Sequence, residues 1–164
     1  CFPETFTGIV EGPEFETYFR EYIYYSAIPM PGAHELLRGL SERYILCTAS
    51  NGPYEQQLHR LKIGDMLQYF TYVFVAENIG FSKPSKAYYE ECFRRLNEGR
   101  EEKILPSETV MIGDSLTADV EGGRQYGMKT CYYNFRNRPV PEDAGIDVAV
   151  TALEEILPGL ERLE

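Results

Sequence analysis

Two aspartates at the end of a predicted strand are the residues whose type and spacing most directly suggest chemistry. Asp114 follows the apolar run 109–112, and Asp119 comes shortly afterwards, where a helix-like stretch begins. Open α/β sheets hold ligands at the carboxyl ends of their strands. Like charges at such an edge are unfavourable unless a cation joins them, and the sequence shows no obvious basic partner. We therefore predict Mg²⁺ at these carboxylates, with a turn residue and an early-helix acid as the structural alternative.

Two further segments lie where predicted strands give way to helices. Ser50, Asn51 and Gly52 follow the predicted strand 44–48, so a hydroxyl and exposed N–H groups could hold a phosphate at a helix amino end. Lys83 lies in a Lys-Pro dipeptide just before another helix, where its charge could neutralise an anionic ligand. Each segment also has a plain structural interpretation, as a capped turn in the first case and as a solvated loop lysine in the second.

The composition indicates an acidic globular protein with one core of ordinary size. The chain has 164 residues, 43% of them apolar, and a net charge of -10, so nucleic acid polymers and anionic membranes are not expected as partners. Its four cysteines show no C-x-x-C spacing, and there is neither a signal peptide nor an apolar stretch of membrane-spanning length. We expect a cytoplasmic protein whose cysteines are small buried residues.

Strand and helix patterns alternate from residue 31 onward. This order favours an α/β fold, a Rossmann-like doubly wound and mostly parallel sheet with helices on both faces. The predicted strands are 44–48, 72–75, 109–112, 129–133 and 147–150, and the predicted helices are 33–40, 54–61, 85–96, 117–126 and a last one from 151.

The first thirty residues differ from the rest of the chain. They carry an aromatic stripe at helical spacing among acidic residues, and a Pro-Met-Pro-Gly sequence then breaks the pattern. The stripe consists of Phe15, Tyr18, Phe19, Tyr22, Ile23 and Tyr25. We interpret 1–30 as a separate helical element and 31–164 as the α/β core. The stripe is expected to pack within a helical domain, with a homodimer surface as the alternative.

In their order, the Ser-Asn-Gly, Lys-Pro and Gly-Asp-Ser-x-x-x-Asp segments resemble the haloacid dehalogenase superfamily of hydrolases. The stretches 76–80 and 122–130 are similar to the pyrimidine 5′-nucleotidase type of phosphatase within it. The resemblance covers nearly the whole chain from Pro31 onward. It implies that 1–30 is the carboxyl-terminal part of a helical cap on the core.

The resemblance also implies a role for each site residue. Ser50 would hydrogen-bond the transferring phosphoryl group, with Asn51 and Gly52 shaping the cradle. Lys83 would neutralise charge on the phosphate and on the nucleophile. Asp114 would be a Mg²⁺ ligand, and Asp119 would bind the metal directly or orient its water. Such a division suits phosphoryl transfer, which depends on positioning and charge stabilisation.

One part of the family pattern is absent from the sequence. The family's nucleophile is an aspartate that forms an aspartyl-phosphate, and it lies in an Asp-x-Asp segment that this sequence does not contain. In the family's sheet, that first strand lies between the strand leading to Ser50 and the strand leading to Asp114. Its absence would leave backbone groups unpaired in the core. We expect that an amino-terminal segment, with the first strand and most of the cap, is missing and that this chain alone is inactive.

For the intact protein, the resemblance implies Mg²⁺-dependent hydrolysis of a small phosphorylated substrate. A nucleoside 5′-monophosphate is the expected substrate. Two alternatives remain. One is a 2-haloacid dehalogenase, which needs no metal, and the other is a non-catalytic relative that binds phosphate and metal without turnover.

Overall fold

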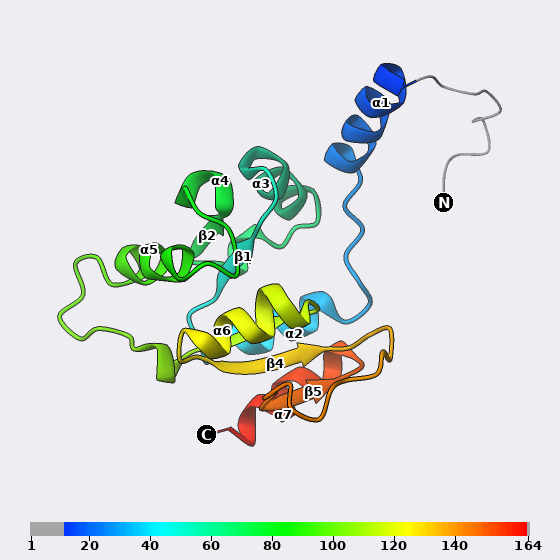
Figure 1. Ribbon diagram of the computed structural model, residues 1–164. Coiled ribbons are helices and arrows are strands. Elements are labelled where there is room, and N and C mark those ends of the chain that lie inside the picture. Colours follow the sequence, from blue (N-terminus) through cyan, green and yellow to red (C-terminus); the bar gives the residue numbers. More distant parts are fainter. Residues whose placement is uncertain (1–11, 164) are drawn as a thin grey trace.

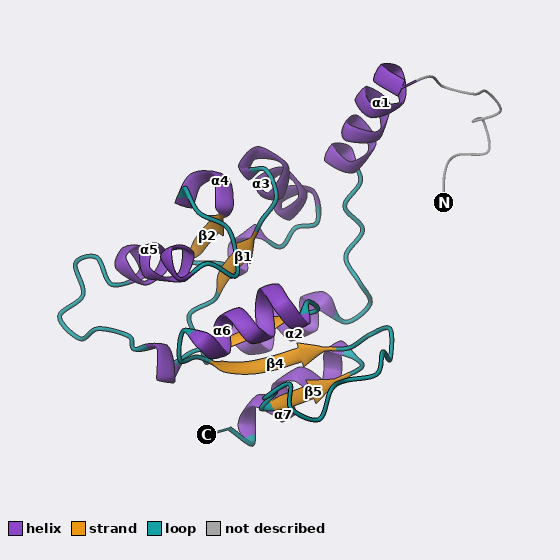
Figure 2. Ribbon diagram, viewed as in Figure 1, coloured by secondary structure: helices purple, strands orange, loops and turns teal. Residues whose placement is uncertain are grey.

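The chain folds into alternating helices and strands, shown in Figures 1 and 2, and a computed structural model describes residues 12–163. The strands are β1 (Cys47–Ser50), β2 (Tyr72–Val75), β3 (Val110–Gly113), β4 (Lys129–Tyr133) and β5 (Val148–Val150). The helices are α1 (Gly12–Tyr25), α2 (Ala33–Ser41), α3 (Tyr54–Ile63), α4 (Ala76–Ile79), α5 (Lys86–Leu96), α6 (Gly122–Gln125) and α7 (Ile156–Glu161). Single turns of 3₁₀-helix lie at Leu67–Tyr69, Pro106–Glu108 and Leu153–Glu155, and a π-helical stretch spans Leu116–Glu121.

All strand pairs of the described chain are parallel, and they form two separate sheets. One sheet pairs β1 with β2, and the other has the order β3-β4-β5. Parallel strands joined by helices give the predicted α/β fold of the Rossmann-like type, which is confirmed. Among the helices of residues 12–163, none has both the length and the apolar character that a membrane crossing requires.

Two apolar cores lie on opposite faces of the strands, because successive side chains of a strand point to opposite faces. On the face covered by α5, Met111 of β3 packs with Phe74 and Tyr88. On the face covered by α2 and α7, Leu40 and Ile156 pack with Cys131 of β4 and with the other side chains of β3. The fold is therefore a sheet region with helices on both faces, as expected.

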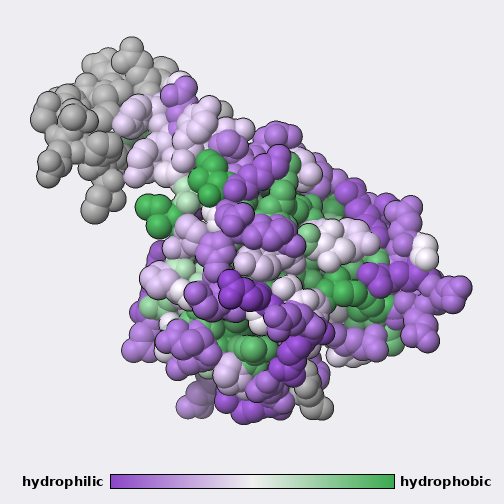
Figure 3. Space-filling view, turned by 180° about the vertical axis from the view of Figure 1, so that it is seen from behind, coloured by the Kyte–Doolittle hydropathy of each residue, from purple (hydrophilic) through white to green (hydrophobic). Residues whose placement is uncertain are grey.

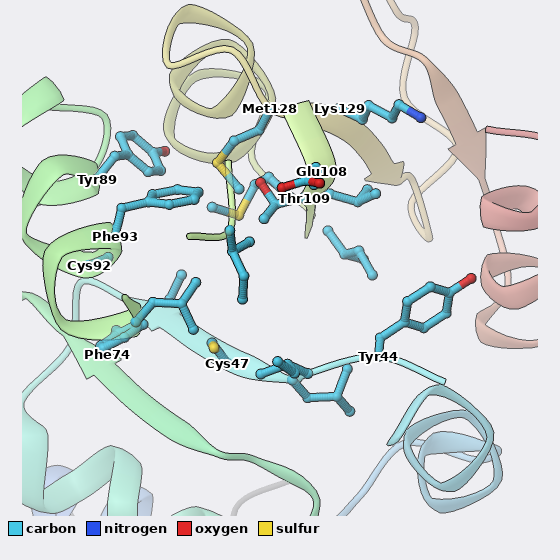
Figure 4. A pocket seen from close by; sticks show the side chains of 18 of the residues that line it. Tyr44, Cys47, Phe74, Tyr89, Cys92, Phe93, Glu108, Thr109, Met128 and Lys129 are labelled. Atoms are coloured by element: carbon cyan, nitrogen blue, oxygen red, sulfur yellow. The ribbon is translucent and has the colours of Figure 1, made fainter. Parts of the chain in front are cut away.

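A cavity of about 610 Å³ lies between the two sheets. Residues 46–49 line one side of it and residues 109–112 line the other. Figure 4 shows that Cys47 and Phe74 face the cavity from below, while Met128 and Thr109 approach it from above. Within residues 12–163 no strand lies between β1 and β3, which is the place where the predicted core lacks its first strand.

Some predicted boundaries shift in the structure. The predicted strand 44–48 forms its ladder at β1, two to three residues later, because Tyr44 and Leu46 pack in the core just ahead of it. The predicted helix 117–126 begins as a π-helical stretch, in which the amide of Val120 bonds the Ser115 carbonyl at 3.1 Å. The short helix α4 was not predicted. Strands β2 and β4 match their predicted ranges.

Helix α1 lies apart from the sheets in Figure 1 and contacts α3. The ring of Tyr24 stacks on His59 of α3 with centroids 4.0 Å apart. Several apolar side chains here remain accessible, since Tyr25 is 66% and Ile28 92% exposed. Seen from behind, apolar surface also emerges between polar regions (Figure 3). The cap assigned to 1–30 stays a prediction, and its residues 1–11 and the side chain of Ile23 lie outside the described part.

Buried thiols should make the fold sensitive to alkaline pH. Burial raises the pKa of Cys47 and of Cys131 from 9.0 to about 11, because a thiolate is poorly solvated inside the protein. Because the folded protein holds these thiol protons more tightly than the unfolded chain, the raised pKa contributes stability below pH 9. That contribution is lost as pH rises through the pKa of the folded protein. We expect the thermal midpoint to fall between about pH 9 and about pH 11, and Cys131→Ala to flatten that fall. A midpoint that stays constant over this range would contradict the prediction.

Candidate active site

A buried ion pair joins two of the segments singled out in the sequence. Lys83 Nζ lies 2.5 Å from Asp119 Oδ1, and both side chains are 8% exposed. The same ammonium group donates to the carbonyl oxygen of Ala49 at 2.5 Å. Since Ala49 lies near the carboxyl end of β1 and Asp119 follows β3, Lys83 joins the carboxyl ends of the two sheets. The expectation that the aspartates have no basic partner is therefore wrong for Asp119, because Lys83 approaches it across 36 residues of sequence.

Asn51 holds the Lys-Pro loop in place. Its Oδ1 accepts from the backbone N–H of Lys83 at 2.8 Å, and its Nδ2 donates to the Lys83 carbonyl at 3.0 Å. The peptide bond between Lys83 and Pro84 is cis. Asn51 thus positions Lys83 through two backbone contacts, which fits a residue that shapes the site.

Ser50 ends β1 beside this loop. Its Oγ accepts from the backbone N–H of Gly52 at 3.2 Å, an interaction that uses a lone pair and leaves the hydroxyl hydrogen free for donation. A Cβ at Gly52 would lie 2.6 Å from Nε2 of Gln57, the far end of a flexible side chain that can move aside. The Ser50 hydroxyl therefore lies at the carboxyl end of β1, and the phosphate cradle assigned to Ser50, Asn51 and Gly52 stays a prediction.

The π-helical stretch places Asp119 over the end of β3. Asp119 Oδ2 accepts from the backbone N–H of Ser115 at 3.0 Å, and the side chain lies against the backbone of Gly113. A π-helical turn is wider than an α-turn and often lies at functional sites. Gly113 and Ser115 therefore position Asp119, which the sequence pattern alone did not show.

Gly113→Ala tests this close packing. A Cβ at this position would overlap the Asp119 carboxylate and lie 2.6 Å from Asp119 Cβ, so the carboxylate must move away from Lys83. We expect a loss of about 3 kcal/mol in the free energy of unfolding, measured by urea denaturation, because a buried ion pair is broken. Gly39→Ala is the matched control, since its Cβ meets only Leu157 Cδ2 at 3.4 Å. Equal stability of the two variants would contradict the assigned role.

Asp114 differs from Asp119 in being exposed. In the described part of the chain, it forms no hydrogen bond or ion pair, whereas both oxygens of Asp119 are engaged. No group of three acidic, His or Cys side chains that could hold a metal occurs within residues 12–163. Mg²⁺ is commonly held by one or two carboxylates, waters and a substrate phosphate. The free carboxylate of Asp114 fits such a site, and the remaining ligands must come from elsewhere.

Two arginines at the same edge were missed by the sequence interpretation. Arg136 and Arg138 line a small cavity together with Asp114. The buried Asn134 holds their loop, because its side chain bonds both the N–H and the carbonyl of Arg138 at 2.9 Å. Their position directly after the predicted strand 129–133 was the signal that could have identified them.

The sequence matches the haloacid dehalogenase-like hydrolase family over residues 3–127. The chain belongs to this family. The resemblance drawn from the three motif segments is thereby confirmed.

Individual relatives of this haloacid dehalogenase-like chain include phosphatases. It is 38% identical to the pyrimidine 5′-nucleotidase PynA of Streptococcus pneumoniae over 117 residues. The matched residues make up 71% of this chain and 47% of PynA. It is 34% identical over 133 residues to the HAD-hydrolase YfnB of Bacillus subtilis, covering 80% of this chain and 54% of YfnB. The chain thus spans about half the length of these curated relatives.

Solved structures show the same fold. The crystal structure of YfnB bound to magnesium has a TM-score of 0.80 at 30% identity, and it covers 93% of this chain and 64% of that chain. A 2-haloacid dehalogenase from Pseudomonas syringae has a TM-score of 0.76 at 22% identity, covering 91% of this chain and 61% of that one. At that identity the second likeness concerns the fold alone.

Proposed function

We propose that the whole protein containing this chain hydrolyses a small phosphomonoester with Mg²⁺, and that its substrate is a nucleoside 5′-monophosphate. The buried pair of Lys83 and Asp119 carries this proposal. It holds an ammonium group at the edge where Ser50 and Asp114 also lie, close to the ends of β1 and β3. A fixed cation beside a hydroxyl donor and a free carboxylate suits a phosphate and its metal.

The proposed roles follow from these contacts. Lys83 donates to a phosphate oxygen and stabilises the charge that develops during transfer, and Asp119 keeps its ammonium group in place. Ser50 donates its hydroxyl hydrogen to a second phosphate oxygen. Asp114 would hold Mg²⁺, which when bound neutralises phosphate charge. Positioning groups of this kind supply most of the acceleration in phosphoryl transfer.

The attacking carboxylate is proposed to come from outside residues 12–163. The Asp119 carboxylate is already engaged by Lys83 and by the Ser115 amide, and within residues 12–163 no strand pairs between β1 and β3. The nucleotidase assignment is supported by the likeness to PynA, whose name states that activity. The Mg²⁺ assignment is supported by the likeness to YfnB, whose crystals contain magnesium.

A phosphate-release assay on the full-length protein tests the proposal. Uridine 5′-monophosphate should be hydrolysed in the presence of Mg²⁺, and EDTA should abolish the reaction. Chloride release from 2-chloropropionate that survives EDTA would instead identify a dehalogenase. Saturable binding of phosphate and Mg²⁺ without any hydrolysis would identify a non-catalytic relative. The 164-residue chain alone is expected to release no phosphate.

A further inference from the structure

The loop that follows β4 has a fixed backbone and exposed side chains. The N–H of Asn134 donates to the Val150 carbonyl at 2.7 Å, and the Asn134 carbonyl accepts from the N–H of Asn137 at 2.9 Å. The Asn134 side chain is 8% exposed and bonds both the N–H and the carbonyl of Arg138. Asn137 has a φ of 48°, a left-handed conformation that asparagine tolerates. A backbone held in this way presents its side chains in one arrangement, which lowers the entropy cost of binding a ligand.

The exposed side chains of this loop form a stack. The rings of Tyr133 and Phe135 are stacked, with centroids 5.4 Å apart and an interplanar angle of 25°. The Cζ atom of Arg136 lies 4.9 Å from the centroid of the Phe135 ring. A guanidinium group is planar and stacks on aromatic rings. Since Phe135 is 42% exposed and Arg136 is exposed as well, the guanidinium and the aromatic pair form a planar platform that faces solvent.

Both arginines of the loop keep their donors available. Arg94 and Arg95 on α5 pair with Glu91, whereas Arg136 and Arg138 form no ion pair within the part of the chain that the structure describes. The chain carries a net charge of -10, so acidic side chains are abundant and yet do not neutralise this loop. A guanidinium group in this state can donate several hydrogen bonds in one plane to a ligand.

The platform lies at the edge of the sheet that holds the candidate active site. Arg136 and Arg138 line a cavity of about 20 Å³ together with Asp114, which is room for about one water molecule. The hydroxyl of Tyr133 lies 3.9 Å from Sδ of Met30, in the segment between α1 and α2 (Figure 1). The loop therefore reaches from the surroundings of Asp114 to the segment that follows α1.

The burial of Lys83 determines where the rest of a bound substrate can lie. Its ammonium group is buried beside Asp119, so a phosphate held there can extend its organic part only toward the exposed side of the edge. Asp114 and Arg136 are both on that exposed side. The platform therefore borders the space into which the part of the substrate beyond the phosphate projects.

We propose that the loop 134–138 binds the base of the nucleotide substrate. The base stacks on the platform of Arg136 and Phe135, as bases stack on guanidinium planes and aromatic rings elsewhere, and Arg138 donates to a carbonyl oxygen of the base. Planar bases that carry carbonyl oxygens, such as uracil, fit this site. The inference rests on the proposed function, because it takes the phosphate to lie at Lys83 and Asp114. Arg136 and Arg138 are thus specificity-determining residues with no part in the chemical step.

Three phosphomonoesters, assayed with the full-length protein, test the role of the base. They are uridine 5′-monophosphate, 5,6-dihydrouridine 5′-monophosphate and ribose 5-phosphate. The dihydro base keeps both carbonyl oxygens but is no longer aromatic and planar, and ribose 5-phosphate has no base. We expect kcat/KM to fall by about threefold or more for the dihydro compound and by about tenfold or more for ribose 5-phosphate, because a stacked base contributes binding energy.

Substitutions in the loop separate stacking from charge. Arg136→Ala should lower kcat/KM for uridine 5′-monophosphate by about tenfold or more and change it for ribose 5-phosphate by less than about twofold. Arg136→Lys keeps the charge without the planar group, so it should lose the preference for the base as well. Arg38→Ala is the matched control, since this exposed arginine lies in the last turn of α2, before the start of β1. It should leave all three rates unchanged.

Two outcomes would overturn the inference. Equal losses for uridine 5′-monophosphate and ribose 5-phosphate in Arg136→Ala would assign this arginine to the phosphate, and a full preference for the base in Arg136→Lys would exclude stacking.

Uridine, which has no phosphate, separates the inference from the proposed function. Saturation-transfer NMR should detect uridine on the full-length protein and lose the signal in Arg136→Ala. This binding pattern in a protein that hydrolyses none of the three compounds would reject the proposed function alone. Hydrolysis of uridine 5′-monophosphate with an unaltered preference in Arg136→Ala would reject only the base site.

Discussion

Lys83→Met should lower kcat of the full-length protein by about 10²- to 10³-fold, the effect of losing one preorganised charge-stabilising donor. It should also destabilise the chain. The ammonium group is 8% exposed and contacts both Asp119 and the Ala49 carbonyl. Its removal leaves the Asp119 charge buried without a cation, which costs about 3–5 kcal/mol. Urea unfolding and steady-state kinetics measure the two effects separately.

A second substitution distinguishes the structural role of Lys83 from its catalytic role. In Lys83→Met with Asp119→Asn, the buried charge is gone, so stability should recover by about 2 kcal/mol or more while kcat stays low. Lys86→Met is the control, because the Lys86–Glu90 pair at 3.1 Å is solvent-exposed. Its loss should change the free energy of unfolding by less than about 0.5 kcal/mol. Recovery of kcat in the double variant, or a rise in KM alone, would reduce Lys83 to a structural or binding residue.

Asp114→Asn should abolish the Mg²⁺ dependence of the full-length protein and lower kcat by about 10²-fold or more. The carboxylate is exposed and has no partner in the described part of the chain, so its neutralisation should leave the fold intact. Magnesium titration of activity measures the effect, and the thermal midpoint without metal should stay the same.

The binding of the metal can also be followed without turnover. Mg²⁺ should raise the thermal midpoint of the full-length protein, because a ligand that binds only the folded state stabilises it, and Asp114→Asn should remove this rise. Asp143→Asn, at an exposed aspartate in the loop before β5, is the control. Full turnover in the Asp114 variant would show that the metal, if used, is held elsewhere.

The sequence pattern located most elements of the core. The ranges predicted for β2 and β4 agree with the structure, and so does the start of α2. These segments have apolar side chains on one or both faces, and that local periodicity reports burial directly. The prediction was less accurate at β1 and at the stretch 116–121, where ladder pairing and the π-helical turn depend on neighbouring elements rather than on local propensity.

The sequence by itself determined the family, the α/β alternation and the positions of Ser50, Lys83 and Asp114 after strands, because each of these depends on residues close together in the chain. Only the tertiary structure decided that Asp119 pairs with Lys83 and that Asn51 holds the Lys83 backbone. It also decided that two unpaired strand edges face one apolar cavity. Such contacts join residues far apart in sequence, so they depend on which elements pack side by side and leave no periodic signal.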